Sequence, residues 1–409
     1  MTAEETPASS NNNETTQAQT TTEALEWHAP VLVRIDEHTT IPHLLKERVQ
    51  RGATRPLILR KIGIGDTWRS ITAREFYDEV HALAAGLIAR GLEPGDRVAI
   101  MSRTRYEWTL LDFACWAAGL VPVPIYETSS IDQVAHVLVD ADVHLIITET
   151  VSMAEIVRAA AEREGRDNTH VLSLDSEAIE TLIAEGSATP RERVLARSEA
   201  LTKDDIATIV YTSGTTGTPK GTVLSHENFT NLCLNAHAWM PEIAAGKNSR
   251  LLLFLPLAHV FARFLQVFQI SGNGVLGHAP NIKNLLPDLA SFKPSYLLVV
   301  PRVLEKIYNS ADTKASGPKR KIFRWAAKVA IAYSQALDTD DGPTASLKAQ
   351  HALADKLVYQ QIIRLVGGNA DYIVSGGAPL APWLAHFYRG VGIPVLEGYG
   401  LTETVGPVS

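Results

Sequence analysis

Apolar and polar positions follow two alternating patterns along the first half of the chain. Apolar residues at every third or fourth position indicate helices, and short runs rich in β-branched residues between them indicate strands. Because helices then join successive strands, the pattern predicts a parallel sheet with helices on both faces. The predicted helices are 73–90, 106–119 and 131–140, and the predicted strands are 97–101, 121–125 and 143–148.

The second half repeats this alternation, but several of its strands run directly into loops of Gly, Ser and Thr. In open α/β sheets, ligands bind outside the carboxyl ends of the strands, so these loops are expected to converge on one crevice. The sequence therefore predicts an α/β fold with a single nucleotide site. The strands concerned are 206–210, 251–255, 296–300, 372–374 and 395–397.

A segment without strand signals interrupts the second half and is predicted as a helical insertion over 308–368. Two amphipathic helices fit its periodicity, the second ending at a C-cap formed by Gly367 and Gly368. The first helix is rich in cations, which suit either contact with an anionic membrane surface or an ordinary solvated face. The apolar positions are Ile322, Phe323, Ala326, Val329, Ala330 and Tyr333, then Leu347, Leu353, Leu357, Ile362 and Leu365. The cations are Lys314, Lys319, Arg320, Lys321, Arg324 and Lys328.

Composition narrows the class of protein. The net charge of −7 argues against a nucleic-acid partner, because phosphate binding needs an excess of Lys and Arg on one face. Cys115 and Cys233 are far apart and lack metal-ligand spacing, which favours reduced thiols in a cytoplasmic protein. The most apolar long window, 251–270, is broken by polar residues and by Pro256, so no membrane span is predicted.

Three parts of the chain are distinguished. Residues 1–25 are polar and lack the order of a signal peptide, which predicts a disordered tail. Residues 26–200 are predicted as a first α/β subdomain, and 201–409 as a second one that carries the nucleotide site.

The loop after strand 206–210 is the most informative stretch. It contains glycines whose backbone amides can approach an anion, several hydroxyl donors and the cation Lys220. A Walker loop requires Gly-Lys-Ser/Thr, but Pro219 precedes this lysine and Gly221 follows it, so an ordinary P-loop NTPase is disfavoured. A flexible linker is the other alternative, but it would seldom follow a buried strand directly.

This loop resembles the phosphate loop of the adenylate-forming superfamily, which includes acyl-CoA synthetases, luciferase and peptide-synthetase adenylation domains. The resemblance implies a large N-terminal domain with two helix-flanked, mostly parallel sheets in five αβαβα layers. Two later segments match further motifs of that superfamily: Ser375-Gly376-Gly377-Ala378 and the run from Glu397 through Gly398, Tyr399, Gly400, Leu401 and Thr402 to Glu403.

The resemblance also implies roles for residues at matching positions. The phosphate loop would hold the β- and γ-phosphates of ATP through Thr212, Ser213, Gly214, Thr215, Thr216, Gly217 and Lys220. Ser375 to Ala378 would lie against adenine, Tyr399 would stack on it, and Glu397, Gly398 and Gly400 would line the nucleotide. Thr402 would bond the α-phosphate, and Glu403 with Thr215 would hold Mg²⁺.

His259 matches the position that borders the substrate carboxylate and gates the acyl tunnel. Thr215, Lys220, His259 and Glu403 are thus the predicted catalytic residues. A lone His beside apolar residues is often a packed core residue, and that alternative stays open here. The stretch 251–287 has no Asp or Glu, so nothing there would pair with the ammonium of an amino acid, and an uncharged acid is favoured.

The run from Leu255 to Arg263 and the helical insertion resemble the long-chain fatty acyl-CoA synthetase branch of the superfamily. The resemblance implies a reaction that uses ATP and Mg²⁺ to activate a long-chain fatty acid as acyl-AMP and then transfers the acyl group to coenzyme A. The resemblance stops a few residues after Glu403, so we expect the chain to be a fragment that lacks a small C-terminal domain in cis. The alternatives are a ligase for aryl or other carboxylic acids, and a non-catalytic module that binds nucleotide or lipid. The expected location is the cytoplasm, with peripheral contact at the inner face of the membrane.

Overall fold

The computed structural model describes residues 30–63, 67–166, 168–212, 218–244 and 249–408. Leu32–Ser409 forms one compact unit, and Met1–Val31 is a separate one. The tail predicted over 1–25 lies outside the described residues.

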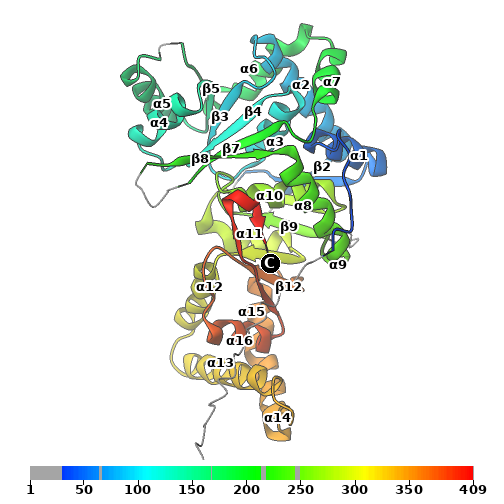
Figure 1. Cartoon of the computed structure of the whole chain (residues 1–409). Helices are drawn as coiled ribbons and strands as arrows, with labels where there is room; N and C mark the ends of the chain where they lie inside the picture. The colour runs from blue at the N-terminus through cyan, green and yellow to red at the C-terminus, as the bar shows by residue number, and fades with distance from the viewer. Residues whose placement is uncertain (1–29, 64–66, 167, 213–217, 245–248, 409) are drawn as a thin grey trace, which may run out of the picture. The chain divides into compact units, whose positions relative to one another are not determined.

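The first sheet has the predicted parallel arrangement, in the order β4-β3-β5-β6. α4 and α5 lie beside this sheet (Figure 1). Its side chains alternate between two cores: Val98 and Ile100 belong to one, and Ala99 and Met101 belong to the core shared with α4 and α5. Three strand predictions are confirmed at both ends. The strands are β3 (Arg97–Met101), β4 (Val121–Ile125), β5 (Val143–Thr148) and β6 (His170–Ser173); the intervening helices are α3 (Tyr106–Ala117), α4 (Ile131–Asp140) and α5 (Val151–Arg163).

The second sheet is built from two groups of strands, ordered β2-β1-β10-β9 and β11-β12-β13. The groups meet where the Ser295 amide donates to the Arg250 carbonyl at 3.0 Å. All pairs are parallel except β1 with β2. The strands are β1 (Pro56–Lys61), β2 (Trp68–Thr72), β9 (Arg250–Leu253), β10 (Val275–His278), β11 (Tyr296–Val299), β12 (Tyr372–Ser375) and β13 (Val395–Glu397).

The strand before the phosphate loop belongs to a hairpin that the sequence did not reveal. β7 (Ile206–Thr212) pairs antiparallel with β8 (Lys220–Ser225). The hairpin is attached to the first sheet, because Thr208 Oγ1 donates to the Pro122 carbonyl of β4 at 2.7 Å. β8 escaped prediction because it follows Pro219 and begins inside the motif itself.

Two helices form the layer between the sheets. Every residue of α3 is buried, as is every residue of α10 (Val260–Ser271) except Phe261. Strand pairing also crosses residue 200, since β1 pairs with β10 and β7 lies beside β4. The division into 26–200 and 201–409 stays a prediction.

The segment 308–368 consists largely of helices, but its buried face differs from the expected one. Ile322, Leu353 and Leu357 are exposed, although the periodicity had placed them in the apolar stripes. The buried stripe of α13 (Pro318–Ala336) starts at Phe323 instead, and a π-helical turn over Asp355–Tyr359 shifts the phase of the second stripe. The expected C-cap is present: Gly367 has a φ of 104° and its amide donates to the Arg364 carbonyl at 3.1 Å.

α13 packs against α16 at this end of the second sheet (Figure 1). The remaining helices are α1 (Ile41–Gly52), α2 (Ala73–Ala89), α6 (Ala178–Glu185), α7 (Arg191–Ala200), α8 (His226–Trp239), α9 (Pro241–Ala244), α11 (Leu285–Phe292), α12 (Pro301–Lys314), α14 (Ala345–Ala354), α15 (Gln360–Leu365) and α16 (Pro382–Val391), with 3-10 turns η1 (Leu174–Ser176), η2 (Gly186–Ala188), η3 (Ile282–Asn284) and η5 (Thr402–Thr404); the last strand pair is β14 (Gly400–Leu401) with β15 (Gly406–Pro407).

Candidate active site

A cavity of about 490 Å³ lies where the carboxyl ends of β7, β12 and β13 meet the start of α10. Loops separated by almost 200 residues of sequence contribute to its wall, because the end of the β7–β8 hairpin lies near the carboxyl ends of the parallel strands β12 and β13. The predicted site residues that line it are Thr212, His259, Gly376, Gly377, Glu397, Gly398, Tyr399, Gly400, Thr402 and Glu403.

The other predicted residues fall into two groups. Lys220, Ser375 and Ala378 are described but do not line this cavity. Ser213, Gly214, Thr215, Thr216 and Gly217 lie outside the described residues. The individual roles assigned to the site residues therefore stay predictions.

Lys220 is placed by strand pairing. It is the first residue of β8 and is the cross-strand partner of Thr212, the last residue of β7. Its side chain is exposed. The register thus places the cation next to a residue of the cavity wall.

The turn after β12 is tightly packed and requires glycine. A Cβ at Gly376 would lie 3.2 Å from the Gly398 carbonyl oxygen and 3.5 Å from the Phe261 ring. Gly377 has a φ of 79°, which other residues rarely adopt. The Gly398 amide donates to the Ser375 carbonyl at 2.8 Å, so the two motif segments are fixed to each other. The Ser375 side chain is buried and its Oγ has no partner within the described residues.

The last motif forms a small antiparallel corner around β14 and β15. A Cβ at Gly400 would lie 1.7 Å from the Gly406 carbonyl oxygen, so the two strands touch at this glycine. Tyr399 is 62% exposed, leaving its ring free to meet a flat ligand. Thr402 and Glu403 follow in η5, and both line the cavity.

His259 lies on the cavity wall and not in the packed core, so the core alternative is wrong. It caps α10, and its Nδ1 accepts a hydrogen bond from the Phe261 amide at 3.2 Å. The residue is exposed and lines the cavity, and partial desolvation of its imidazole lowers the pKa below the ordinary value. The neutral ring, with Nδ1 as acceptor, carries its proton on Nε2.

A second cavity of about 410 Å³ adjoins the first and extends it toward the end of β4. Both cavities are lined by Thr212, His259 and Thr402. His259 therefore stands where the two spaces meet.

One lobe of the 490 Å³ cavity is apolar and carries no charged side chain. Three of its residues come from the stretch 251–287, and residues of α8 and α9 that sequence reasoning missed join them. The lobe is lined by Ala236, Met240, Ile243, Phe264, Leu265, Phe268, Tyr296 and Leu298.

A buried polar network ties the hairpin to α10. Arg263 and Asp112 are fully buried and form an ion pair at 2.9 Å. Arg263 Nη1 also donates to Thr208 Oγ1 of β7 at 3.0 Å, and Gln266 Nε2 donates to Asp112 at 2.9 Å. Burial raises the pKa of Asp112 and lowers that of Arg263, and their attraction offsets this penalty. The network holds the first turn of α10, and with it His259, against the strand that leads to the phosphate loop.

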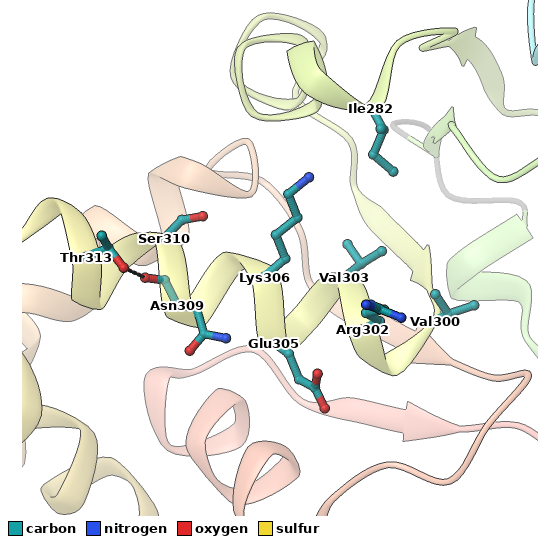
Figure 2. Close-up of a pocket in the computed structure, with 9 residues that line it drawn as sticks. All are labelled: Ile282, Val300, Arg302, Val303, Glu305, Lys306, Asn309, Ser310 and Thr313. Atoms are coloured by element: carbon teal, nitrogen blue, oxygen red, sulfur yellow. Dashed lines mark hydrogen bonds between the residues drawn. The ribbon is translucent and has the colours of Figure 1, made fainter.

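A separate open groove of about 860 Å³ runs along α12 (Figure 2). None of the predicted site residues lines it, but its Val300 lies 3.6 Å from the Cβ position of Gly377. Arg302 and Lys306 are exposed there, and neither has an ion-pair partner within the described part of the chain. Figure 2 shows Lys306 and Glu305 extending to opposite sides of the helix.

The described side chains fit magnesium held chiefly by phosphate. Within the described residues, no three His, Cys, Asp or Glu side chains are grouped to hold a metal ion. The cavity does present the exposed carboxylate of Glu403. Mg²⁺ commonly binds through one or two carboxylates together with substrate phosphates, so a single carboxylate at this point is sufficient.

A sequence comparison decides the family. The profile of the family described as AMP-binding enzyme matches residues 45–409. The chain belongs to the AMP-binding enzyme family. This confirms the resemblance recognised from the motifs around Lys220, Gly376 and Glu403.

Curated relatives of this AMP-binding enzyme are longer than the chain. The long-chain-fatty-acid–CoA ligase FadD15 of Mycobacterium bovis is 42% identical over 390 residues, which cover 94% of this chain and 64% of the relative. Long chain acyl-CoA synthetase 3 of Arabidopsis thaliana is 29% identical over 390 residues, covering 88% and 56%. The chain thus spans at most about two thirds of these relatives.

Solved structures confirm the α/β fold predicted for this AMP-binding enzyme. The N-terminal domain of FACL13 from Mycobacterium tuberculosis superposes with a TM-score of 0.66 at 22% identity, covering 90% of this chain and 77% of that one. The N-terminal subdomain of Klebsiella oxytoca NpsA, in complex with 3-hydroxyanthranilyl-AMSN, gives 0.62 at 20% identity, covering 89% and 73%.

Proposed function

We propose that this chain carries the acid- and nucleotide-binding site of an ATP- and Mg²⁺-dependent ligase that activates a long-chain fatty acid as acyl-AMP and transfers it to coenzyme A. The observation that carries the proposal is a single cavity. Its wall includes the motif segments around Gly376 and Tyr399, which match nucleotide-binding motifs, and also the uncharged apolar lobe. The name of the 42% identical relative supports the same reaction.

The first step brings together two anions, the fatty carboxylate and the α-phosphate, so the site has to neutralise and align them. The cavity wall supplies the Thr402 hydroxyl, and Lys220 adds a cation beside Thr212. The neutral His259 can donate from Nε2 to a carboxylate oxygen, because its Nδ1 is already occupied. Mg²⁺ bound at Glu403 would neutralise further phosphate charge.

Attack by the carboxylate forms the acyl–phosphate bond and breaks the bond to pyrophosphate. The thiol of coenzyme A then replaces AMP. Coenzyme A also carries phosphates, which Arg302 and Lys306 in the groove along α12 could bind. Val300 of this groove lies next to Gly377, in the turn proposed to lie against adenine. We therefore place the approach of coenzyme A at this groove.

The location is proposed as cytoplasmic with peripheral contact at a membrane. No helix among the described residues is long and apolar enough to cross a bilayer. Arg320 and Arg324 bind Asp312, which leaves fewer free cations than the sequence indicated. Lys319, Lys321 and Lys328 remain exposed beside Ile322 on α13, a combination that suits an anionic lipid surface. Cosedimentation with anionic vesicles at low salt tests this contact, and absence of binding would remove it.

Isothermal titration calorimetry with acyl-sulfamoyl-adenosine analogues tests the main proposal. We expect the hexadecanoyl analogue to bind more tightly than the benzoyl and alanyl analogues, because only the alkyl chain fills the apolar lobe. Tighter binding of the benzoyl analogue would favour an aryl-acid ligase instead.

Catalysis requires a separate measurement, since the relatives are longer than this chain. Pyrophosphate exchange with palmitate should be measured on the chain and on a version extended through a C-terminal domain in cis. Binding of analogues without exchange in either version would favour the non-catalytic module.

A further inference from the structure

The two faces of β11 belong to different cores. Tyr296 and Leu298 line the 490 Å³ cavity, whereas Leu297 and Val299 pack on the opposite side with α11 and α12. Successive side chains of a strand point to opposite faces, so the cavity follows one face of this strand from its carboxyl end inward. Tyr296 is the first residue of the strand and hence the innermost of its cavity-lining residues.

The Tyr296 ring is held in place by a buried polar group behind it. Its hydroxyl donates to Gln269 Oε1 at 2.6 Å, and both residues are almost fully buried. Gln269 Nε2 in turn lies 3.3 Å from both the carbonyl and the hydroxyl of Ser249, and 3.2 Å from the Val275 carbonyl.

The Gln269 side chain is itself packed closely against the backbone at Gly274. A Cβ at Gly274 would lie 1.9 Å from Gln269 Nε2, so the amide fills the room that a side chain there would need. Moving the tyrosine ring would break its hydrogen bond and leave a buried acceptor unpaired. The ring is therefore a fixed wall, unlike a flexible apolar side chain.

The length of this face can be compared with an alkyl chain. Val300, which follows the last residue of β11, is four residue steps from Tyr296, which corresponds to about 13 Å of strand. Bonds of about 1.5 Å at about 111° advance about 1.25 Å each, so roughly ten carbons fit along this path. A longer chain has to turn toward α8 and α9, where Met240 is 37% exposed.

We propose that Tyr296, fixed by Gln269, ends the straight path of the acyl chain and so determines which chain lengths bind best. This inference rests on the proposed function, because it assumes that the apolar lobe holds an alkyl chain. Removing the ring opens room for about two further methylene groups along the strand.

The test measures the dissociation constants of decanoyl- and hexadecanoyl-sulfamoyl-adenosine by calorimetry. Tyr296→Ala should raise the preference for the longer analogue about tenfold relative to the wild-type protein, the effect of about two additional buried methylene groups. Leu297→Ala is the matched control: it removes a similar apolar side chain from the opposite face of β11, and it should leave the preference within about twofold.

The outcomes separate the two proposals. If the wild-type protein binds neither analogue, the proposed function fails. If it binds both and Tyr296→Ala shows the wild-type preference, or Leu297→Ala shows the same shift, Tyr296 does not set chain length. Should Tyr296→Ala lose its cooperative thermal transition, Tyr296→Leu retains more apolar bulk, and an unchanged preference in that variant would equally overturn the inference.

Discussion

Replacing Arg263 by methionine removes a buried cation without greatly changing the volume of the side chain. The Asp112 carboxylate, which is fully buried, then loses its charged partner and keeps the neutral side-chain donor Gln266. Breaking a buried pair in this way costs about 3–5 kcal/mol because one charge stays buried without a partner. A typical unfolding free energy is about 5–15 kcal/mol, so this loss is a large part of the whole.

The loss should depend on pH with a defined sign. Without the guanidinium, the attraction that most strongly opposes the effect of burial is gone, so the pKa of Asp112, already raised in the wild-type protein, rises further. An acid whose folded pKa exceeds its unfolded value stabilises the fold at low pH, and that stabilisation is lost as the pH rises through the folded pKa. Arg263→Met should therefore be less destabilising at pH 5 than at pH 8.

Equilibrium urea unfolding measures this effect, and the Trp116 ring, 5.7 Å from the Arg263 guanidinium carbon, offers a nearby fluorescent reporter. The double variant Arg263→Met/Asp112→Leu should recover most of the stability, since apolar residues can replace a buried pair at little cost. A loss below about 1 kcal/mol in the single variant, or no recovery in the double variant, would refute the reasoning.

Three further predictions concern the site, acid stability and the α12 groove. Gly400→Ala should weaken binding of hexadecanoyl-sulfamoyl-adenosine about tenfold with little change in melting temperature, because its Cβ collides with the Gly406 carbonyl at an exposed corner; unchanged affinity would contradict this. Burial lowers the pKa of His226 to about 4, so its contribution to stability is lost as pH falls from about 6.5 through 4. His226→Gln should reduce the loss of unfolding free energy between pH 7.5 and 4.5 by about 2–3 kcal/mol, and an equal loss in both proteins would contradict it. In a version extended through the C-terminal domain, Arg302→Glu/Lys306→Glu should raise the KM for coenzyme A and leave that for ATP unchanged; an unchanged KM for coenzyme A would remove the groove from the mechanism.

The sequence predicted helices and strands well where the hydrophobic periodicity agrees with Gly or Pro residues at the ends of the element. The bounds of β3, β4 and β5 match their predictions, and helix 106–119 is shorter only by the residues at its C-terminal end, where Gly119 adopts a φ of 77°. Motif spacing likewise indicated that His259 and Glu403 would share one crevice.

The missed features depend on contacts across space. Asp112 was not predicted because the partners that explain a buried carboxylate in this helix, Arg263 and Gln266, come 151 and 154 residues later. The fixed position of the Tyr296 ring was missed for the same reason, because it depends on a hydrogen bond to Gln269 in another element. Neither pairing changes the hydrophobic periodicity from which helices and strands are predicted, since each involves a single residue on each element.

The pairing of β1 with β10 also bears on how the protein is made. Leu57 and Ile58 are fully buried in the finished fold, and nearby Arg48 bonds to the Gly274 carbonyl 226 residues later. At about 5–20 residues per second, the ribosome needs roughly 10–45 s to supply that partner strand. During this interval β1 can pair only with β2, so its other edge stays without a partner strand until β10 has been made.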